Sequence, residues 1–208
     1  TPVCSTLKTP GPRNGVLISV SNLPVKTINP GELHVSNRPC VIKTLLGSCV
    51  SVCIYNHEKH FGGMNHFMLP SVDAGSPRTE DDFRFGDLST ESLIESMLEF
   101  DTHKNHLTVK VFGGGRVVSS LSRSKIGQKN INSAHTMLSE YHLEIIKEYV
   151  GKDNGVKIIF NTGTGKVRLQ DITSSDQNKS VIKERESNIT TILSGSENTS
   201  GIDLTVED

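Results

Sequence analysis

Short apolar runs separated by glycine-containing turns fill the middle of the chain. In CVIKTLLGSCVSVCIY, two runs rich in β-branched residues flank Gly47-Ser48, a pattern that predicts a strand, a turn and a second strand. Alternate residues of a strand point to opposite faces, so the second run divides into two sets. One face carries Val50, Val52 and Ile54, and the other carries Cys49, Ser51, Cys53 and Tyr55. The segment FGGMNHFML then predicts a turn that enters another strand.

Two segments have the spacing of amphipathic helices. In STESLIESMLEF, Ser89 or Thr90 is the expected N-cap, and the apolar residues that follow at helical spacing are Leu93, Ile94, Met97 and Leu98. In IGQKNINSAHTMLSEY, one helical stripe carries Ile131, Ala134, Leu138 and Tyr141. Further strands are predicted in LTVKVFGGG, LEIIKEYV and VKIIFNTGTGKVRLQ, where the last segment has the pattern of a hairpin. Because strands outnumber helices and often follow one another directly, the pattern predicts an α+β fold rather than a doubly wound parallel sheet.

The distribution of residue types divides the chain into three parts. At 208 residues, the chain is long enough for one good core and short for two full domains. Residues 1–15 are rich in Pro, Gly, Ser and Thr, which predicts a flexible leader. Residues 171–208 contain no aromatic residue and much Ser, Asn and Glu, which predicts a largely disordered tail that becomes ordered on a partner. The folded body is therefore expected over residues 16–170.

Charge and hydropathy narrow the classes of partner. The formal net charge is −1 and both signs are mixed along the chain, which predicts neither a basic face for nucleic acid nor a polybasic membrane patch. No apolar run approaches the roughly 20 residues of a membrane span, and the first residues lack the profile of a signal peptide. We expect a cytoplasmic protein without membrane insertion. In that compartment the four cysteines, Cys4, Cys40, Cys49 and Cys53, are expected to be free thiols.

Cys49 and His66 are the candidates for chemistry. A thiol attacks a carbonyl carbon as the thiolate, so a catalytic cysteine needs a nearby base or cation. Gly47 permits a sharp turn directly before Cys49, and backbone N–H groups in such a turn can form an oxyanion hole. His66 lies in the next strand region, beyond the loop NHEKHFGG, whose reversal sets the two strands side by side. Spacing alone leaves two interpretations open: a nucleophile with its base, or two buried strand residues.

Metal and nucleotide sites are not predicted. Cys49, Cys53, His57 and His60 superficially resemble a zinc-ligand set, but four residues of strand place the two thiols about 13 Å apart, too far to share one ion. The glycine clusters FGGGRVV and NTGTGK lack the order of a P-loop and are expected to be turns. We therefore expect no cofactor. The remaining histidines lie in polar contexts and are expected to be solvated; they are His34, His103, His106, His135 and His142.

Five motifs in a fixed order carry a family resemblance. The segments IKTLLGSCVSVCIY, GGMNHFMLP, KVFGGG, IGQKNI and FNTGTGKVRL resemble those of the CheD family of bacterial chemoreceptor glutamine deamidases, over roughly Asn29 to Gln170. The resemblance implies a three-layer α/β/β sandwich, with a catalytic design similar to that of the cytotoxic necrotizing factor toxins. It also implies that Cys49 is the nucleophile, that His66 is its acid and base, and that the backbone at Ser48 and Cys49 binds the oxyanion.

Thr44 is the candidate third member of this site. The family pattern has a threonine shortly before the Gly-Ser-Cys turn, and Thr44 is the nearest match. Two roles stay open for it, orientation of His66 or satisfaction of a strand end. In NGVK the sequence departs from the family pattern, which often has an arginine there, and this departure bears on partner choice more than on catalysis.

The resemblance implies both a reaction and partners. The substrates would be selected glutamines on the cytoplasmic helices of chemoreceptors, converted to glutamate through a Cys-thioester intermediate, and receptor methyl esters would form the same acyl-enzyme. A CheC-type phosphatase is the expected second partner. A different class of function, an adaptor that binds the receptor or CheC with little turnover, is the alternative. A cysteine protease is disfavoured, because no Asn or Asp motif of a papain-like site is recognisable.

Overall fold

The fold is built from two β-sheets and a layer of helices. The computed structural model describes residues 23–72, 83–117, 125–172 and 178–197. The four-stranded sheet has the order β1-β3-β8-β9, made of β1 (Val25–Thr27), β3 (Val41–Leu46), β8 (Gly155–Asn161) and β9 (Val167–Ile172). The five-stranded sheet has the order β2-β5-β4-β6-β7, made of β2 (Glu32–Ser36), β5 (Phe61–His66), β4 (Val50–Asn56), β6 (Leu107–Gly113) and β7 (Ile145–Val150). Pairing is antiparallel except between β1 and β3 and between β6 and β7.

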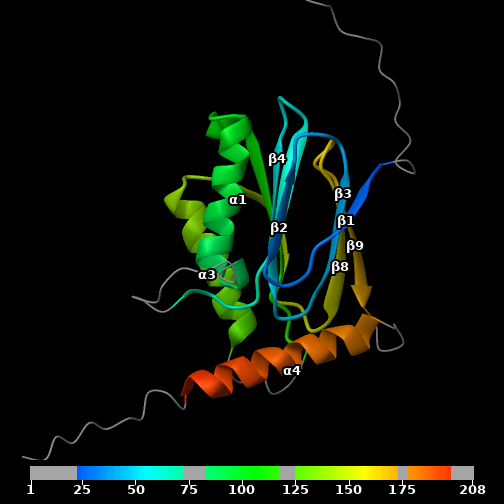
Figure 1. The fold of residues 1–208 in the computed structure, drawn as a ribbon, viewed down its shortest axis with the longest axis vertical. Helices are drawn as coiled ribbons and strands as arrows, with labels where there is room; N and C mark the ends of the chain where they lie inside the picture. The colour runs from blue at the N-terminus through cyan, green and yellow to red at the C-terminus, as the bar shows by residue number, and fades with distance from the viewer. Residues whose placement is uncertain (1–22, 73–82, 118–124, 173–177, 198–208) are drawn as a thin grey trace, which may run out of the picture.

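The helices α1 and α3 cover one face of the five-stranded sheet, and the four-stranded sheet covers the other (Figure 1). These helices are α1 (Gly86–Phe100) and α3 (Ile126–Glu140), and a short 3₁₀ helix, η3 (Lys104–His106), leads into β6. A further helix, α4 (Asn178–Glu197), lies across one end of the layers. The predicted α+β class and three-layer α/β/β sandwich are confirmed.

Strand β4 belongs to two hydrophobic cores because it lies in the middle layer. Val50, Val52 and Ile54 pack in the core between the five-stranded sheet and the helices. Cys49 and Cys53 pack in the core between the two sheets. The alternation seen in the sequence therefore corresponds to the two faces of β4, as predicted. The hairpin prediction is also confirmed, since β8 and β9 pair antiparallel next to each other.

The start of α1 differs from the prediction. The helix begins a turn earlier than expected, with Phe85 at the N-cap and Ser89 and Thr90 buried inside its first turns. Gly86 lies so close to the ring of Phe67 that a Cβ there would overlap it. This tertiary contact, rather than a side-chain cap, determines where the helix begins.

The tail also differs from the prediction. Residues 178–197 form α4, and Ile182, Glu186 and Ile189 on one of its faces are buried. Disorder is therefore the wrong prediction for this part of the tail, and β9 extends the folded body to Ile172. The leader 1–15 and Cys4 lie outside the described residues. Cys40, Cys49 and Cys53 are free thiols, as expected. Among the helices that the structure describes, none is long and apolar enough to cross a membrane.

Candidate active site

Cys49 lies where the chain passes from one sheet to the other. It follows β3 of the four-stranded sheet and directly precedes β4 of the five-stranded sheet, and its side chain is 2% exposed. The glycine turn after β6 holds this position: Gly114 N–H donates to the Cys49 carbonyl at 2.7 Å. At Gly113, φ is +102° and a Cβ would overlap the Cys49 carbonyl oxygen. The FGGG motif is thus a turn, as predicted, and it also fixes the backbone of the cysteine.

Cys49 and His66 point to the same side of the five-stranded sheet. A bridge between Val50 and Phe67 continues the antiparallel register of β4 and β5, with both N–H···O distances at 3.0 Å. Cys49 precedes Val50 and His66 precedes Phe67, so both side chains point away from the Val50 face and toward the other sheet. Such diagonal neighbours have Cα atoms about 7–8 Å apart. The structure therefore places the two residues that the sequence singled out on the same face of the sheet, as diagonal neighbours.

Thr44 reaches His66 from the opposite sheet. Thr44 lies within β3, and its Oγ1 is 2.7 Å from Nδ1 of His66 and donates to the Ile28 carbonyl at 2.7 Å. Because the carbonyl can only accept, the hydroxyl proton is used there and the Thr44 oxygen accepts from Nδ1–H of His66. Nε2 of His66 is then the unprotonated nitrogen. This atom is buried and has no hydrogen-bond partner among the described residues.

Burial keeps both candidate catalytic groups neutral in this state. His66 is fully buried, and burial, followed by the charge of Arg185, lowers its pKa to about 3. Burial raises the pKa of the Cys49 thiol above its ordinary range, and the Glu186 carboxylate raises it further. Cys53, which lies in the same inter-sheet core, also has a thiol pKa raised by burial. The pair is therefore a thiol beside a neutral imidazole.

Ser48, the predicted oxyanion residue, is hydrogen-bonded to α4. Its backbone N–H donates to Glu186 Oε1 at 2.7 Å, and its hydroxyl donates to Glu186 Oε2 at 2.6 Å. Asn130 of α3 donates to the Ser48 carbonyl at 3.1 Å and to the Met68 carbonyl at 2.9 Å. Burial raises the pKa of Glu186, and the hydrogen bonds from Ser48 oppose that shift. The Gly-Ser-Cys turn is thus held by two helices that the sequence interpretation did not connect with it.

A cavity of about 380 Å³ opens beside the Ser48 turn. Its walls come from the glycine turn after β6, the start of α3 and α4, and they include Gly114, Arg116, Lys125, Gln128 and Glu186. No sequence motif indicated Glu186, and Asn130 lies in the IGQKNI motif, for which the sequence predicted a helical stripe but no contact with the Ser48 turn. The only signal for Glu186 was the spacing of Ile182, Glu186 and Ile189, which falls on one face of a helix.

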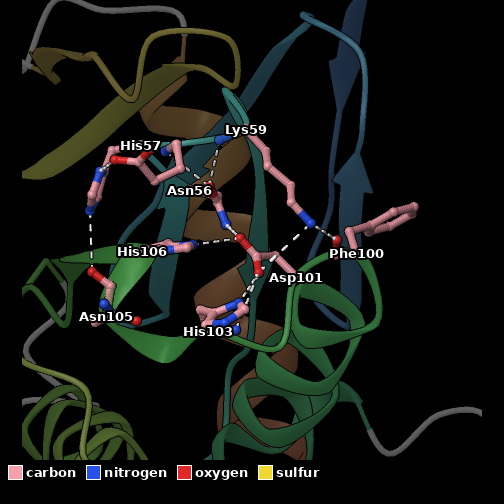
Figure 2. Close-up of polar contacts among 9 residues, drawn as sticks. Asn56, His57, Lys59, Phe100, Asp101, His103, Asn105 and His106 are labelled. Carbon is pink, nitrogen blue, oxygen red and sulfur yellow. Dashed lines mark hydrogen bonds and ion pairs between the residues drawn. The ribbon is translucent and has the colours of Figure 1, made fainter. Parts of the chain in front are cut away.

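A second polar cluster lies at the other end of β4 (Figure 2). Buried Asp101 accepts hydrogen bonds from Nδ1 of His103 at 2.9 Å and of His106 at 2.8 Å, and from Asn56 at 2.8 Å. His103 and His106 are therefore bound to a carboxylate rather than simply solvated. Asp101, His103 and His106 each carry an atom that could bind a metal ion, and these atoms lie within 4.8 Å of one another. Since both carboxylate oxygens already accept hydrogen bonds, the arrangement fits a structural link between β4, α1 and β6.

The chain is similar to proteins of one family. A family model described as "CheD chemotactic sensory transduction" matches residues 68–171. The probable chemoreceptor glutamine deamidase CheD of Trichlorobacter lovleyi is 41% identical over 141 residues, which cover 67% of this chain and 86% of the relative. The protein of the same description from Hahella chejuensis is 38% identical over 162 residues, covering 76% of this chain and 75% of the relative. That from Rhodospirillum rubrum is 36% identical over 157 residues, covering 75% and 87%.

Proposed function

The chain belongs to the CheD family, and we propose that it is a chemoreceptor glutamine deamidase with Cys49 as its nucleophile. The relatives described above carry the name of that activity. The observation that supports the proposal most directly is the arrangement of Thr44, His66 and Cys49. A buried hydroxyl holds Nδ1 of the imidazole, the free Nε2 is left as a base, and the thiol lies on the same face of the sheet.

The first half of the reaction forms an acyl-enzyme. Nε2 of His66 takes the thiol proton, and Sγ of Cys49 attacks the carbon of the glutamine carboxamide. Backbone N–H groups at Ser48 and Cys49 donate to the oxygen that becomes negative in the tetrahedral intermediate. His66 then returns the proton to the departing nitrogen, which leaves as ammonia, and the thioester remains.

The second half restores the thiol. His66 removes a proton from water, the resulting hydroxide attacks the thioester carbon, and Sγ leaves and takes the proton back. The net change is one glutamine and one water converted to one glutamate and one ammonia. A receptor methyl ester would enter the same thioester with methanol as the leaving group, so ester hydrolysis belongs to the same proposal.

Thr44 is the positioning residue in this proposal. By accepting from Nδ1–H, it keeps the lone pair of His66 on Nε2, the nitrogen that must exchange protons with Cys49. Its location in the other sheet means that the site is complete only when the two sheets are packed together. Binding of a CheC-type phosphatase and a cytoplasmic location remain predictions from the family resemblance.

The adaptor alternative has one observation in its favour. In this state Cys49 is 2% exposed and the Ser48 N–H is occupied by Glu186, so the site is closed to substrate. One experiment separates the two functions: the protein and its His66→Ala variant are incubated with a chemoreceptor cytoplasmic fragment, and binding of the fragment, ammonia release and peptide masses are measured. Conversion of Gln to Glu by the wild type alone supports the deamidase. Receptor binding without ammonia release by either protein would establish the adaptor.

A further inference from the structure

Helix α4 presents one buried face to the active-site end of the two sheets. Ile189 lies in the core between the sheets. Ile182 packs so closely against Gly47 and Gly155 that a Cβ atom on either glycine would overlap it. Glu186 lies between them along the helix and is 1% exposed. The three residues stand at the spacing of a single helical face. Figure 1 shows α4 running from the β9 side across the end of the two sheets toward the helix layer.

The Glu186 carboxyl group lies against two hydrogen-bond donors of the turn that precedes Cys49. Its two oxygens accept from the N–H and the hydroxyl of Ser48, and no Lys or Arg among the described residues forms an ion pair with it. The adjacent Arg185 instead donates to the Leu45 carbonyl and to Asn29. Burying a carboxylate without a paired cation is costly unless strong donors face it. Those donors belong to the turn that precedes Cys49.

Glu186 is chemically the product of glutamine deamidation. A glutamate on a helix reaches the turn before Cys49 with its side-chain carboxylate, which is where a substrate carboxamide must lie for the thiol to attack it. Gly47 makes this approach possible, since a Cβ at that position would overlap the Glu186 carboxylate. The same glycine would admit the side chain of any helix that docks in this groove.

We propose that α4 occupies the groove of the substrate helix, with Glu186 as an intramolecular product mimic. This inference rests on the proposed deamidase function and adds to it what occupies the substrate's place in the closed state and which neighbouring residues of the substrate helix dock with the glutamine. The substrate is a glutamine on an amphipathic helix, with an apolar residue four positions before it and another three positions after it, as Ile182 and Ile189 flank Glu186. Such a helix must displace α4 before it reaches Cys49.

The closed state also explains why the Cys49 thiol is buried and has a raised pKa. Docked α4 buries Cys49, and the nearby Glu186 carboxylate adds to the rise in the thiol pKa. Removal of α4 from the groove exposes the cavity beside Ser48 and takes away the neighbouring negative charge. Displacement by a substrate helix therefore frees the oxyanion donors and favours the thiolate in the same step.

The first test measures self-deamidation of the Glu186→Gln variant. In the Glu186→Gln variant, the introduced amide lies in the substrate position, so Cys49 forms a thioester with its carbon, ammonia leaves and water restores a carboxyl group. Peptide mass analysis of the purified variant is expected to find glutamate at this position. The double variant Cys49→Ala/Glu186→Gln is the matched control and is expected to keep the amide. An intact amide in a variant that still deamidates a receptor fragment would overturn the inference, whereas a wild type inactive on that fragment contradicts the proposed function itself.

The second test measures access to the thiol. Glu186→Ala removes both hydrogen bonds to Ser48, while Glu184→Ala changes an exposed residue on the same helix and serves as the control. Alkylation of Cys49 by iodoacetamide is expected to be about tenfold faster or more in Glu186→Ala than in Glu184→Ala. Equal alkylation rates in the two variants would show that α4 does not close the site, which contradicts the proposal.

Discussion

Replacing Thr44 with valine tests the positioning of the imidazole. Valine has nearly the same shape as threonine, so the change removes the hydroxyl and little else. Thr44 is 3% exposed, and its hydroxyl forms hydrogen bonds with Nδ1 of His66 and with the Ile28 carbonyl, each at 2.7 Å. Both partners are left without this hydrogen bond in the variant.

The magnitude follows from those two contacts. A buried polar group that loses its partner costs about 1–3 kcal/mol, so we expect Thr44→Val to lower the free energy of unfolding by roughly that amount for each partner. Without the hydroxyl, His66 is free to adopt the other tautomer, with the proton on Nε2. General acid–base catalysis contributes about 10²–10⁴-fold to rate, and we expect a loss of about 10- to 100-fold in kcat with little change in KM.

The assay is steady-state release of ammonia from a receptor fragment, with thermal unfolding measured on the same samples. Thr44→Ser keeps the hydroxyl and is expected to restore most of kcat, which a purely packing role would not predict. If folded Thr44→Val has kcat within about twofold of the wild type, the Thr44 hydroxyl does not position His66 for catalysis.

Three further predictions concern stability. The pKa of His66 is lowered to about 3 in the folded state, so the unfolded chain takes up a proton on this residue before the folded chain does. The free energy of unfolding should therefore be highest above about pH 6.5 and fall by up to about 1.4 kcal/mol per pH unit as the pH falls toward 3. Denaturant unfolding of His66→Gln over this range should show a weaker pH dependence. Hydrogen bonds from His106, Asn56 and His103 hold the pKa of Asp101 well below its usual range. Asp101→Asn should therefore lower the thermal midpoint of unfolding at neutral pH, and the difference from wild type should shrink as the pH falls below about 4. Gly113→Ala, at φ +102° against the Cys49 carbonyl, should cost about 1–3 kcal/mol in denaturant unfolding and should also slow ammonia release.

Local patterns in the sequence were sufficient for most elements. The alternation in β4 predicted which residues face which core, because a strand buried on both faces still places neighbours on opposite sides. Cys49 and His66 were brought to one face by the pairing of adjacent strands, which a loop between them already indicated. The start of α1 was missed because Gly86 packs against Phe67, a contact between segments that no local capping rule contains.

The missing parts of the site depend on contacts between distant segments. Thr44 meets His66 only because the two sheets pack face to face, so the sequence left its role open. Glu186 reaches Ser48 from a helix that has few apolar residues and that composition assigned to disorder. Its helical stability comes from the docking of three residues on the sheets, which propensity along the chain does not reveal.

A comparison of two buried cysteines in the same protein tests whether Cys49 is the nucleophile. Cys49→Ala and Cys53→Ala each remove one thiol from the inter-sheet core, and both residues are at most 2% exposed, so the packing cost of the two changes is similar. The measurement is the rate at which glutamine in receptor peptides is converted to glutamate, followed by peptide mass. We expect Cys53→Ala to retain deamidation and Cys49→Ala to lose it while remaining folded. Deamidation by folded Cys49→Ala at the rate of Cys53→Ala would contradict the assignment of Cys49 as the nucleophile.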